Sequence, residues 1–133
     1  MKNPIFFFKS RIISFKNAFS GLFYVIRTQK NAWIHAISTI AVLGLSLWLK
    51  LSFVKISILI LAITSVWAAE FINTALEAVV DLSSPSIHPL AKVGKDVGAA
   101  SVLIAALSSI IIGILIIGPS LYEKLINIYN VLR

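Results

Sequence analysis

The 133-residue chain contains no cysteine, and no acidic residue precedes Glu70. Without cysteine it can form neither a disulfide bond nor a thiolate metal site. Charged residues make up only 13% of the chain, whereas 59% of the residues are hydrophobic and the mean hydropathy is +0.96. A water-soluble domain of this size would not tolerate so much apolar surface, so the composition predicts a membrane protein.

Common motifs of nucleotide enzymes are also missing. The sequence has no phosphate-binding loop of the form GxxxxGKS or GxxxxGKT, and no HRD or DFG kinase motif. It also shows no internal repeat of the kind common in transporters. The basic residues give a net charge of +7, but they flank apolar runs instead of alternating with aromatic residues. This pattern argues against nucleic-acid binding and indicates membrane anchors.

The apolar segments predict the fold. Residues 5–27 carry polar side chains on one helical face at Lys9, Lys16, Ser20 and Arg27, which predicts an amphipathic helix on the membrane surface. Three apolar runs follow at about 32–49, 53–80 and 97–117, and each approaches or exceeds the roughly 20 residues that a span requires. We therefore expect an all-α membrane protein with an N-terminal surface helix and three transmembrane helices, forming one domain over residues 1–133.

The orientation follows from the basic residues. Six of them precede the first span, so the positive-inside rule places the N-terminus in the cytoplasm. The segment 81–95 is then a cytoplasmic loop, broken by the prolines and serines of 83–89, and the tail after Pro119 is external. Asp96 is a candidate N-cap for the third span. His35 and His88 lie near span boundaries and are interpreted as interfacial polar groups.

The second span carries an unusual row of polar residues. At about 100° and 1.5 Å per residue, the side chains of Glu70, Asn73, Glu77 and Asp81 share one helical stripe about 16 Å long. Ionisable groups in a membrane span are costly, so such a row indicates a functional site. Carboxylates are hard oxygen ligands of the kind that Mg²⁺ prefers, and in phosphoryl transfer Mg²⁺ bridges the nucleotide phosphates. Glu70, the deepest carboxylate, is the candidate acceptor for the proton of a lipid hydroxyl.

Two other functions remain open on the residues alone. The carboxylates could line the path of a small ion or drug transporter. They could also fasten helices together in a purely structural membrane module.

Three segments carry a family resemblance. The runs EFINTALEAVVD, HPLAKVGKDVGAASVLIAA and SFKNAFSG together resemble the small prokaryotic integral-membrane diacylglycerol kinase family, which includes undecaprenol kinases. The resemblance covers essentially the whole chain. It implies a homotrimer in the bacterial inner membrane, with active sites shared between neighbouring subunits, that transfers the γ-phosphate of MgATP to a lipid hydroxyl. The HPLAK segment favours undecaprenol over diacylglycerol as the acceptor.

The resemblance also implies roles for individual residues. Glu70 corresponds to the catalytic base, and Asn73 is its polar neighbour at the substrate. The positions that correspond to nucleotide contacts are Asp81, Lys95, Asp96 and, in the surface helix, Arg11.

The metal site departs from the family pattern. Glu77 corresponds to a magnesium ligand, and family members commonly place a second glutamate just before the first span. This chain has Gln29 at that position. An amide can still offer its carbonyl oxygen to a hard cation, but it removes one negative charge. We therefore predict that Glu77 and Gln29 are Mg²⁺ ligands, and that this site has one negative charge fewer than is common in the family.

Overall fold

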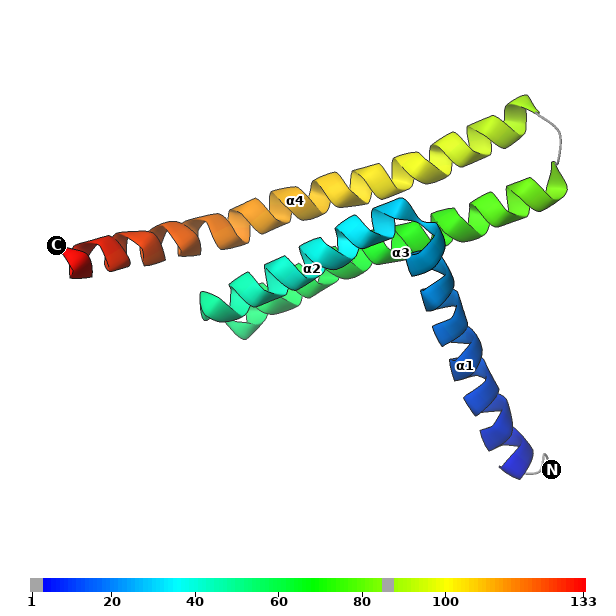
Figure 1. The fold of residues 1–133 in the computed structure, drawn as a ribbon, viewed down its shortest axis with the longest axis horizontal. Helices are drawn as coiled ribbons and strands as arrows, with labels where there is room; N and C mark the ends of the chain where they lie inside the picture. The colour runs from blue at the N-terminus through cyan, green and yellow to red at the C-terminus, as the bar shows by residue number, and fades with distance from the viewer. Residues whose placement is uncertain (1–3, 85–87) are drawn as a thin grey trace.

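The computed structural model describes residues 4–84 and 88–133. Within these ranges the chain forms four helices and no strand: α1 (Pro4–Thr28), α2 (Lys30–Trp48), α3 (Phe53–Ser83) and α4 (Pro89–Leu132). The helices α2, α3 and α4 run side by side, and α1 leaves them at a steep angle (Figure 1). These three helices are each long and apolar enough to cross a membrane, which confirms the predicted all-α fold with three spans.

Short breaks separate the first three helices. Gln29 alone divides α1 from α2, because its backbone is extended (φ −96°, ψ 117°). At the turn between α2 and α3, Lys50 adopts the left-handed conformation with φ 54°, and Ser52 caps α3 by accepting a hydrogen bond from the backbone N–H of Lys55. These breaks reverse the chain at the α2–α3 turn and direct α1 away from the bundle.

The prediction that Asp96 caps the third span was wrong. The helix α4 begins at Pro89, whose fixed φ suits the first helical position. His88 is the N-cap, and its Nδ1 accepts a hydrogen bond of 3.2 Å from the backbone N–H of Leu90. Asp96 therefore lies two turns inside the helix, and His88 has a structural role that its interpretation as an interfacial group did not include.

The predicted loop was also too long. Most of segment 81–95 is helical, because α3 continues to Ser83 and α4 starts at Pro89. Part of the predicted break at 83–89 falls on residues 85–87, which lie outside the described residues. The helix α4 also continues through Pro119 to Leu132, so the segment after Pro119 is helical.

The core is a narrow stripe along α3, which packs against both α4 and α2. Its buried side chains recur every three or four residues, as expected for one helical face. Toward the α2–α3 turn they are the apolar Leu59, Ala62 and Val66, and toward the other end they are the polar Glu70, Asn73 and Thr74. Because burying polar groups is costly, the polar half of this stripe requires a functional explanation.

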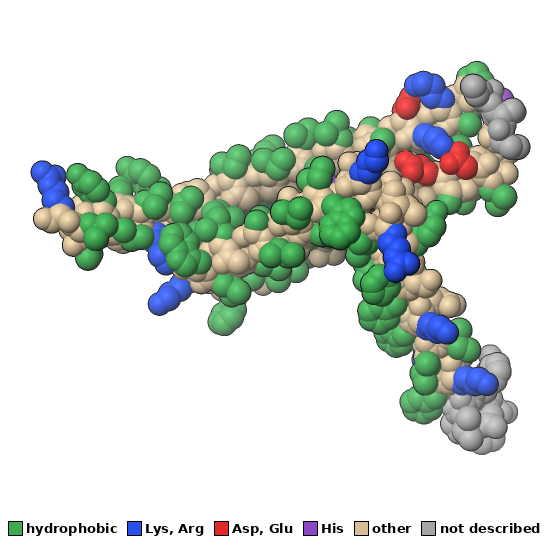
Figure 2. All heavy atoms as spheres, viewed as in Figure 1, with side chains coloured by type: hydrophobic (Ala, Val, Ile, Leu, Met, Phe, Trp, Pro, Cys, Tyr) green, Lys and Arg blue, Asp and Glu red, His purple; other side chains and the backbone are tan. Residues whose placement is uncertain are grey.

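The outer surface is apolar over most of its length. Along α1, Phe8, Ile12, Phe15 and Phe19 are each more than half exposed. Figure 2 shows hydrophobic side chains along one flank of α1 and basic side chains along the other. Exposed apolar surface on this scale marks contact with a membrane. The amphipathic character predicted for this helix is therefore confirmed from Phe8 onward.

Candidate functional site

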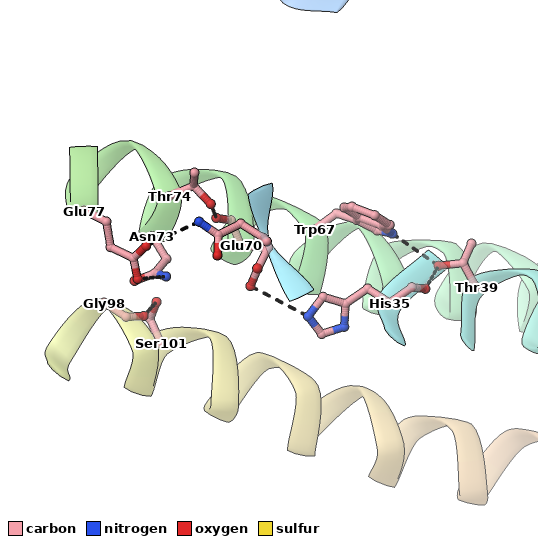
Figure 3. Close-up of polar contacts among 10 residues, drawn as sticks. His35, Thr39, Trp67, Glu70, Asn73, Thr74, Glu77, Gly98 and Ser101 are labelled. Atoms are coloured by element: carbon pink, nitrogen blue, oxygen red, sulfur yellow. Dashed lines mark hydrogen bonds and ion pairs between the residues drawn. The ribbon is translucent and has the colours of Figure 1, made fainter. Parts of the chain in front are cut away.

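A cleft of about 260 Å³ opens where the start of α2 faces α3 and α4. It is lined on α3 by Glu70, Asn73 and Glu77, which Figure 3 shows, and on α4 by small and apolar side chains. Its lining consists of Gln29, Asn31, His35, Glu70, Asn73, Glu77, Ala99, Val102, Leu103 and Ala106.

The polar side chains of α3 become more exposed along the helix. Glu70 is 2% exposed and Asn73 is buried, Glu77 is half-buried, and the side chain of Asp81 is 64% exposed. The predicted stripe therefore exists as a graded series from the interior of the bundle to its end. Burying a carboxylate such as that of Glu70 is costly unless neighbouring groups compensate its charge.

Glu77 is held by two amides. The Nδ2 of Asn73 donates a hydrogen bond of 3.0 Å to Oε1, and the Nε2 of Gln29 donates one of 3.3 Å to Oε2. Gln29 reaches Glu77 because it is the N-cap residue of α2, where the chain enters the bundle. The structure thus brings together the two residues predicted as metal ligands.

Asn73 also lies close to Gly98 of α4. Its Oδ1 is buried and finds no hydrogen-bond partner among the described residues. A Cβ added at Gly98 would collide with this oxygen, so the absence of a side chain at Gly98 allows the approach. An unpartnered buried oxygen requires an explanation, and in a cleft a ligand hydroxyl or amine can supply the missing donor.

Glu70 faces His35 of α2. The Nε2 of His35 lies 3.7 Å from Oε2 of Glu70 and makes no hydrogen bond within the described part of the chain. The edge of the Trp67 ring packs against the imidazole, with 6.0 Å between ring centroids. Trp67 also donates a hydrogen bond of 3.2 Å to Thr39, whose hydroxyl donates one of 2.7 Å to the carbonyl oxygen of His35. These contacts fix the imidazole beside Glu70 (Figure 3).

The sequence analysis missed His35, which it interpreted as an interfacial polar group. The available signal was that His35 is the one ionisable residue of α2 after Lys30. Its partner lies 35 positions away on another helix, and no local spacing reveals that pairing.

Two ion pairs lie at the exposed end of the stripe, in the cluster of mixed charge that Figure 2 shows beside the end of α3. Lys95 of α4 pairs with Asp81 of α3 at 2.5 Å, and Lys92 pairs with Asp96 one helical turn away at 2.5 Å. All four side chains are at least 40% exposed, so these pairs add little to stability and remain accessible to a ligand.

Arg11 is not brought to this site. It lies exposed on α1, which extends away from the other helices (Figure 1), and it does not line the cleft. A role for Arg11 at its own protomer's cleft would require a different position of α1.

The donor set limits the kind of metal site. No group of three or more His, Cys, Asp or Glu side chains within 4–84 and 88–133 could hold a metal ion. Glu77 offers one carboxylate, and Gln29 and Asn73 offer amide oxygens. Mg²⁺ in phosphoryl-transfer sites is usually held by one or two carboxylates together with substrate phosphates. These residues therefore fit a magnesium ion that arrives with a nucleotide and do not fit a protein-only metal cage.

Comparisons with known proteins show the family to which the chain belongs. A family model described as prokaryotic diacylglycerol kinase matches residues 16–117. The chain is 40% identical over 115 residues to an undecaprenol kinase of Bacillus subtilis, covering 86% of this chain and 90% of the relative. It is 37% identical over 116 residues to a diacylglycerol kinase of Synechocystis sp., covering 86% of this chain but 66% of that relative's length. A diacylglycerol kinase of Escherichia coli is 30% identical over 95 residues, with 66% of this chain and 78% of the relative covered.

The matched region contains the whole cleft, from Gln29 to Ala106. The chain therefore belongs to the prokaryotic diacylglycerol kinase family, a family of membrane lipid kinases.

Proposed function

We propose that this protein transfers the γ-phosphate of MgATP to the hydroxyl of a membrane lipid, and that the lipid is undecaprenol. The observation that carries this proposal is the buried carboxylate of Glu70 in a cleft whose polar residues lead to an exposed, charged end. A lipid hydroxyl and a nucleotide can approach each other only at such a boundary between apolar and polar surroundings.

An apolar cavity beside the cleft supports a lipid acceptor. It has a volume of about 170 Å³, lies between α2, α3 and α4, and shares His35 and Ala106 with the cleft. Its other lining residues include Ile34, Val66 and Ile110. A lipid chain in this cavity would place its polar terminus beside Glu70.

Glu70 then acts as the general base. Its carboxylate takes the proton of the lipid hydroxyl while the hydroxyl oxygen attacks the γ-phosphorus, and the bond from that phosphorus to the oxygen of the departing ADP breaks. His35 orients the carboxylate from the side opposite Asn73. The buried position of Glu70 excludes water, which would otherwise compete with the lipid for the phosphate.

Glu77 and Gln29 form the nucleotide side of the cleft. When bound with ATP, Mg²⁺ supplies charge neutralisation at the phosphates, and these two residues would hold it there. Asn73 lies between Glu70 and Glu77 on α3, and its hydrogen bond to Glu77 links the acceptor side of the cleft to the nucleotide side. Asp81, Lys95 and Asp96, at the exposed end, are the proposed nucleotide contacts.

We also propose that the active protein is a homotrimer in the bacterial inner membrane with the charged end of α3 in the cytoplasm. The excess of basic residues before the first span supports this orientation. Because α1 extends away from its own cleft, a nucleotide contact by Arg11 requires a neighbouring protomer. Light scattering of the detergent-solubilised protein measures the subunit number. A monomer with full activity would contradict the proposal that neighbouring protomers share active sites.

The acceptor preference rests on two observations. The HPLAK segment resembles the undecaprenol kinase branch, and the Bacillus subtilis undecaprenol kinase is 40% identical over 90% of its length. Diacylglycerol remains the second candidate, because the Synechocystis relative named as a diacylglycerol kinase is 37% identical.

A radiolabel assay tests the function and ranks the acceptors. Purified protein in detergent micelles is incubated with γ-labelled ATP and, separately, undecaprenol, diacylglycerol or ceramide, and labelled lipid is separated by thin-layer chromatography. We expect Mg²⁺-dependent labelling that is strongest for undecaprenol. Glu70→Gln should lower turnover by about 10² to 10⁴, the contribution of a positioned general base.

Glu123→Gln is the matched control, because it removes the one carboxylate that lies at the opposite end of the molecule. It should retain turnover. Equal turnover by Glu70→Gln and the parent would show that Glu70 is not the base. Ion flux in vesicles without ATP or lipid phosphorylation would instead support a transporter.

A further inference from the structure

The end of the bundle opposite the carboxylates contains a second, larger recess. It has a volume of about 630 Å³ and lies between the α2–α3 turn and the last turns of α4. Three lysines line it, Lys50 and Lys55 from the turn region and Lys124 from α4, together with polar side chains and one carboxylate, Glu123. The charged lining therefore sums to +2, from three ammonium groups and one carboxylate.

Contacts between α4 and the turn shape this recess. The Nζ of Lys124 donates a hydrogen bond of 2.6 Å to the carbonyl oxygen of Trp48 and lies 4.3 Å from the centre of the Trp48 ring. The Nζ of Lys55 donates one of 3.0 Å to the hydroxyl of Ser120. The left-handed backbone of Lys50 forms the turn beneath them. The lysines are thus part of an organised site between two elements that are distant in sequence.

These ammonium groups lack carboxylate partners. Among the described residues, none of Lys50, Lys55 and Lys124 forms an ion pair, whereas both Lys92 and Lys95 at the other end do. Uncompensated cations that converge on a recess attract an anion.

The position of the recess across the membrane indicates which anion it binds. Lys55 and Glu77 both lie on α3, and their separation of 22 residues corresponds to about 33 Å of helix. The hydrocarbon core of a bilayer is about 30 Å thick. When Glu77 lies at one membrane interface, the lysines therefore lie at the other, where the abundant anions are lipid phosphates. Trp48 is the kind of aromatic residue found at this depth.

The wall supplied by α4 lies beyond the segment that the family model matches. That match ends at residue 117, and Ser120, Lys124 and Asn127 follow it. The recess is therefore built partly by an extension of α4 and is separate from the proposed catalytic cleft.

We propose that this recess binds the phosphate group of an anionic phospholipid in the leaflet opposite the catalytic cleft, with phosphatidylglycerol as the test ligand. Lys50 and Lys55 attract the phosphate, and Lys124 holds α4 and Trp48 in place around it. A bound phospholipid would stabilise the junction between the α2–α3 turn and the α4 extension.

Fluorescence quenching in vesicles of the full-length protein tests this site. Trp33→Phe and Trp67→Phe leave Trp48 as the sole tryptophan, and its quenching by brominated phosphatidylglycerol is compared with quenching by brominated phosphatidylcholine. We expect phosphatidylglycerol to bind about 25-fold more strongly, because Lys50 and Lys55 each contribute roughly fivefold to the attraction of an anionic lipid. Lys50→Gln with Lys55→Gln should reduce this preference to about equal binding. Circular dichroism verifies that helical content is retained.

Two comparisons make the result decisive. Arg27→Gln with Lys30→Gln removes the same charge from the junction of α1 and α2 and should leave the Trp48 preference unchanged. An equal loss of the phosphatidylglycerol preference in both double variants would show that the preference arises from the general surface potential. That result would disprove a specific site in the recess. Equal quenching by the two lipids in the parent would also overturn it. Loss of the preference in inorganic phosphate, but not in chloride of equal ionic strength, would show that the two compete for one site and would support recognition of the lipid phosphate group.

Discussion

The side-chain amide of Gln29 donates a hydrogen bond to Oε2 of Glu77 across the interface of α2 and α3. The family resemblance predicts a glutamate at position 29, and two facing carboxylates would repel each other until a cation arrived. The amide removes that repulsion and satisfies Glu77 directly. The resting cleft is thereby stabilised, but one negative charge is lost for binding Mg²⁺.

Gln29→Glu should therefore raise the affinity for Mg²⁺. A unit charge about 4 Å from a divalent cation contributes on the order of 2 kcal/mol at the dielectric constant of water. We expect the Mg²⁺ concentration for half-maximal turnover to fall about tenfold, equivalent to about 1.4 kcal/mol. The measurement is a Mg²⁺ titration of lipid phosphorylation at fixed ATP.

Gln29→Leu serves as the control, because it keeps a similar volume without an oxygen donor, and it should require more Mg²⁺ than the parent. If all three proteins had the same Mg²⁺ dependence, position 29 would have no part in metal binding.

Gly98→Ala should damage the cleft although alanine favours helices. Its Cβ would displace Oδ1 of Asn73, so the amide must turn away from Glu77 or α4 must move away from α3. Overpacking of this kind costs about 1 to 3 kcal/mol. We expect a lower melting temperature and at least a tenfold loss of turnover.

Gly113→Ala separates this effect from helix propensity. No described atom lies within 4 Å of a Cβ at Gly113, so the change should be neutral or stabilise the helix by up to about 1 kcal/mol. Equal melting temperatures and turnover for the two alanine variants would disprove the close approach at Gly98.

His35→Ala should reduce kcat about tenfold and leave the KM for ATP unchanged. The imidazole contacts Glu70, the proposed base, and lies on the acceptor side of the cleft. A residue that orients the base affects the chemical step more than nucleotide binding. Steady-state kinetics with ATP and lipid varied separately measure both constants.

Two further variants examine this role. His35→Gln keeps a polar side chain and should recover part of the lost kcat. His88→Ser replaces the other histidine with a residue that still caps α4 and should behave like the parent. A higher KM for ATP with normal kcat in His35→Ala would place His35 at the nucleotide instead.

The long helices and the polar stripe were predictable because their signals are local. Hydropathy alone gives the three spans, and helical periodicity places Glu70, Asn73 and Glu77 on one face. The start of α4 was not found, because Asp96 is a stronger capping residue in general than His88, and only the structure shows that Pro89 already begins the helix.

The contacts of His35 and Gln29 were not predictable for a different reason. Both contacts cross from α2 to α3 and depend on how far the helices slide past each other. That relative position is set by how the side chains of the two helices fit together, and single-sequence periodicity contains no information about it.

The ion pair between Lys95 and Asp81 joins the ends of α3 and α4, with side chains that are 40% and 64% exposed. Exposed pairs contribute about 0 to 1 kcal/mol to stability. If these residues served only to hold the helices together, their removal would change little. The proposed contact with nucleotide predicts a much larger effect on ATP binding.

Asp81→Asn, Lys95→Gln and the double variant distinguish these roles in one double-mutant cycle. We expect each single variant to raise the KM for ATP about tenfold or more, and the melting temperatures to change little. Because each residue would contact the nucleotide separately, the double variant should be worse than either single variant. A structural pair predicts the opposite pattern, since the second change costs little once the first has broken the pair. Lys92→Gln removes a neighbouring ion pair on the same helix and should leave the KM for ATP nearly unchanged.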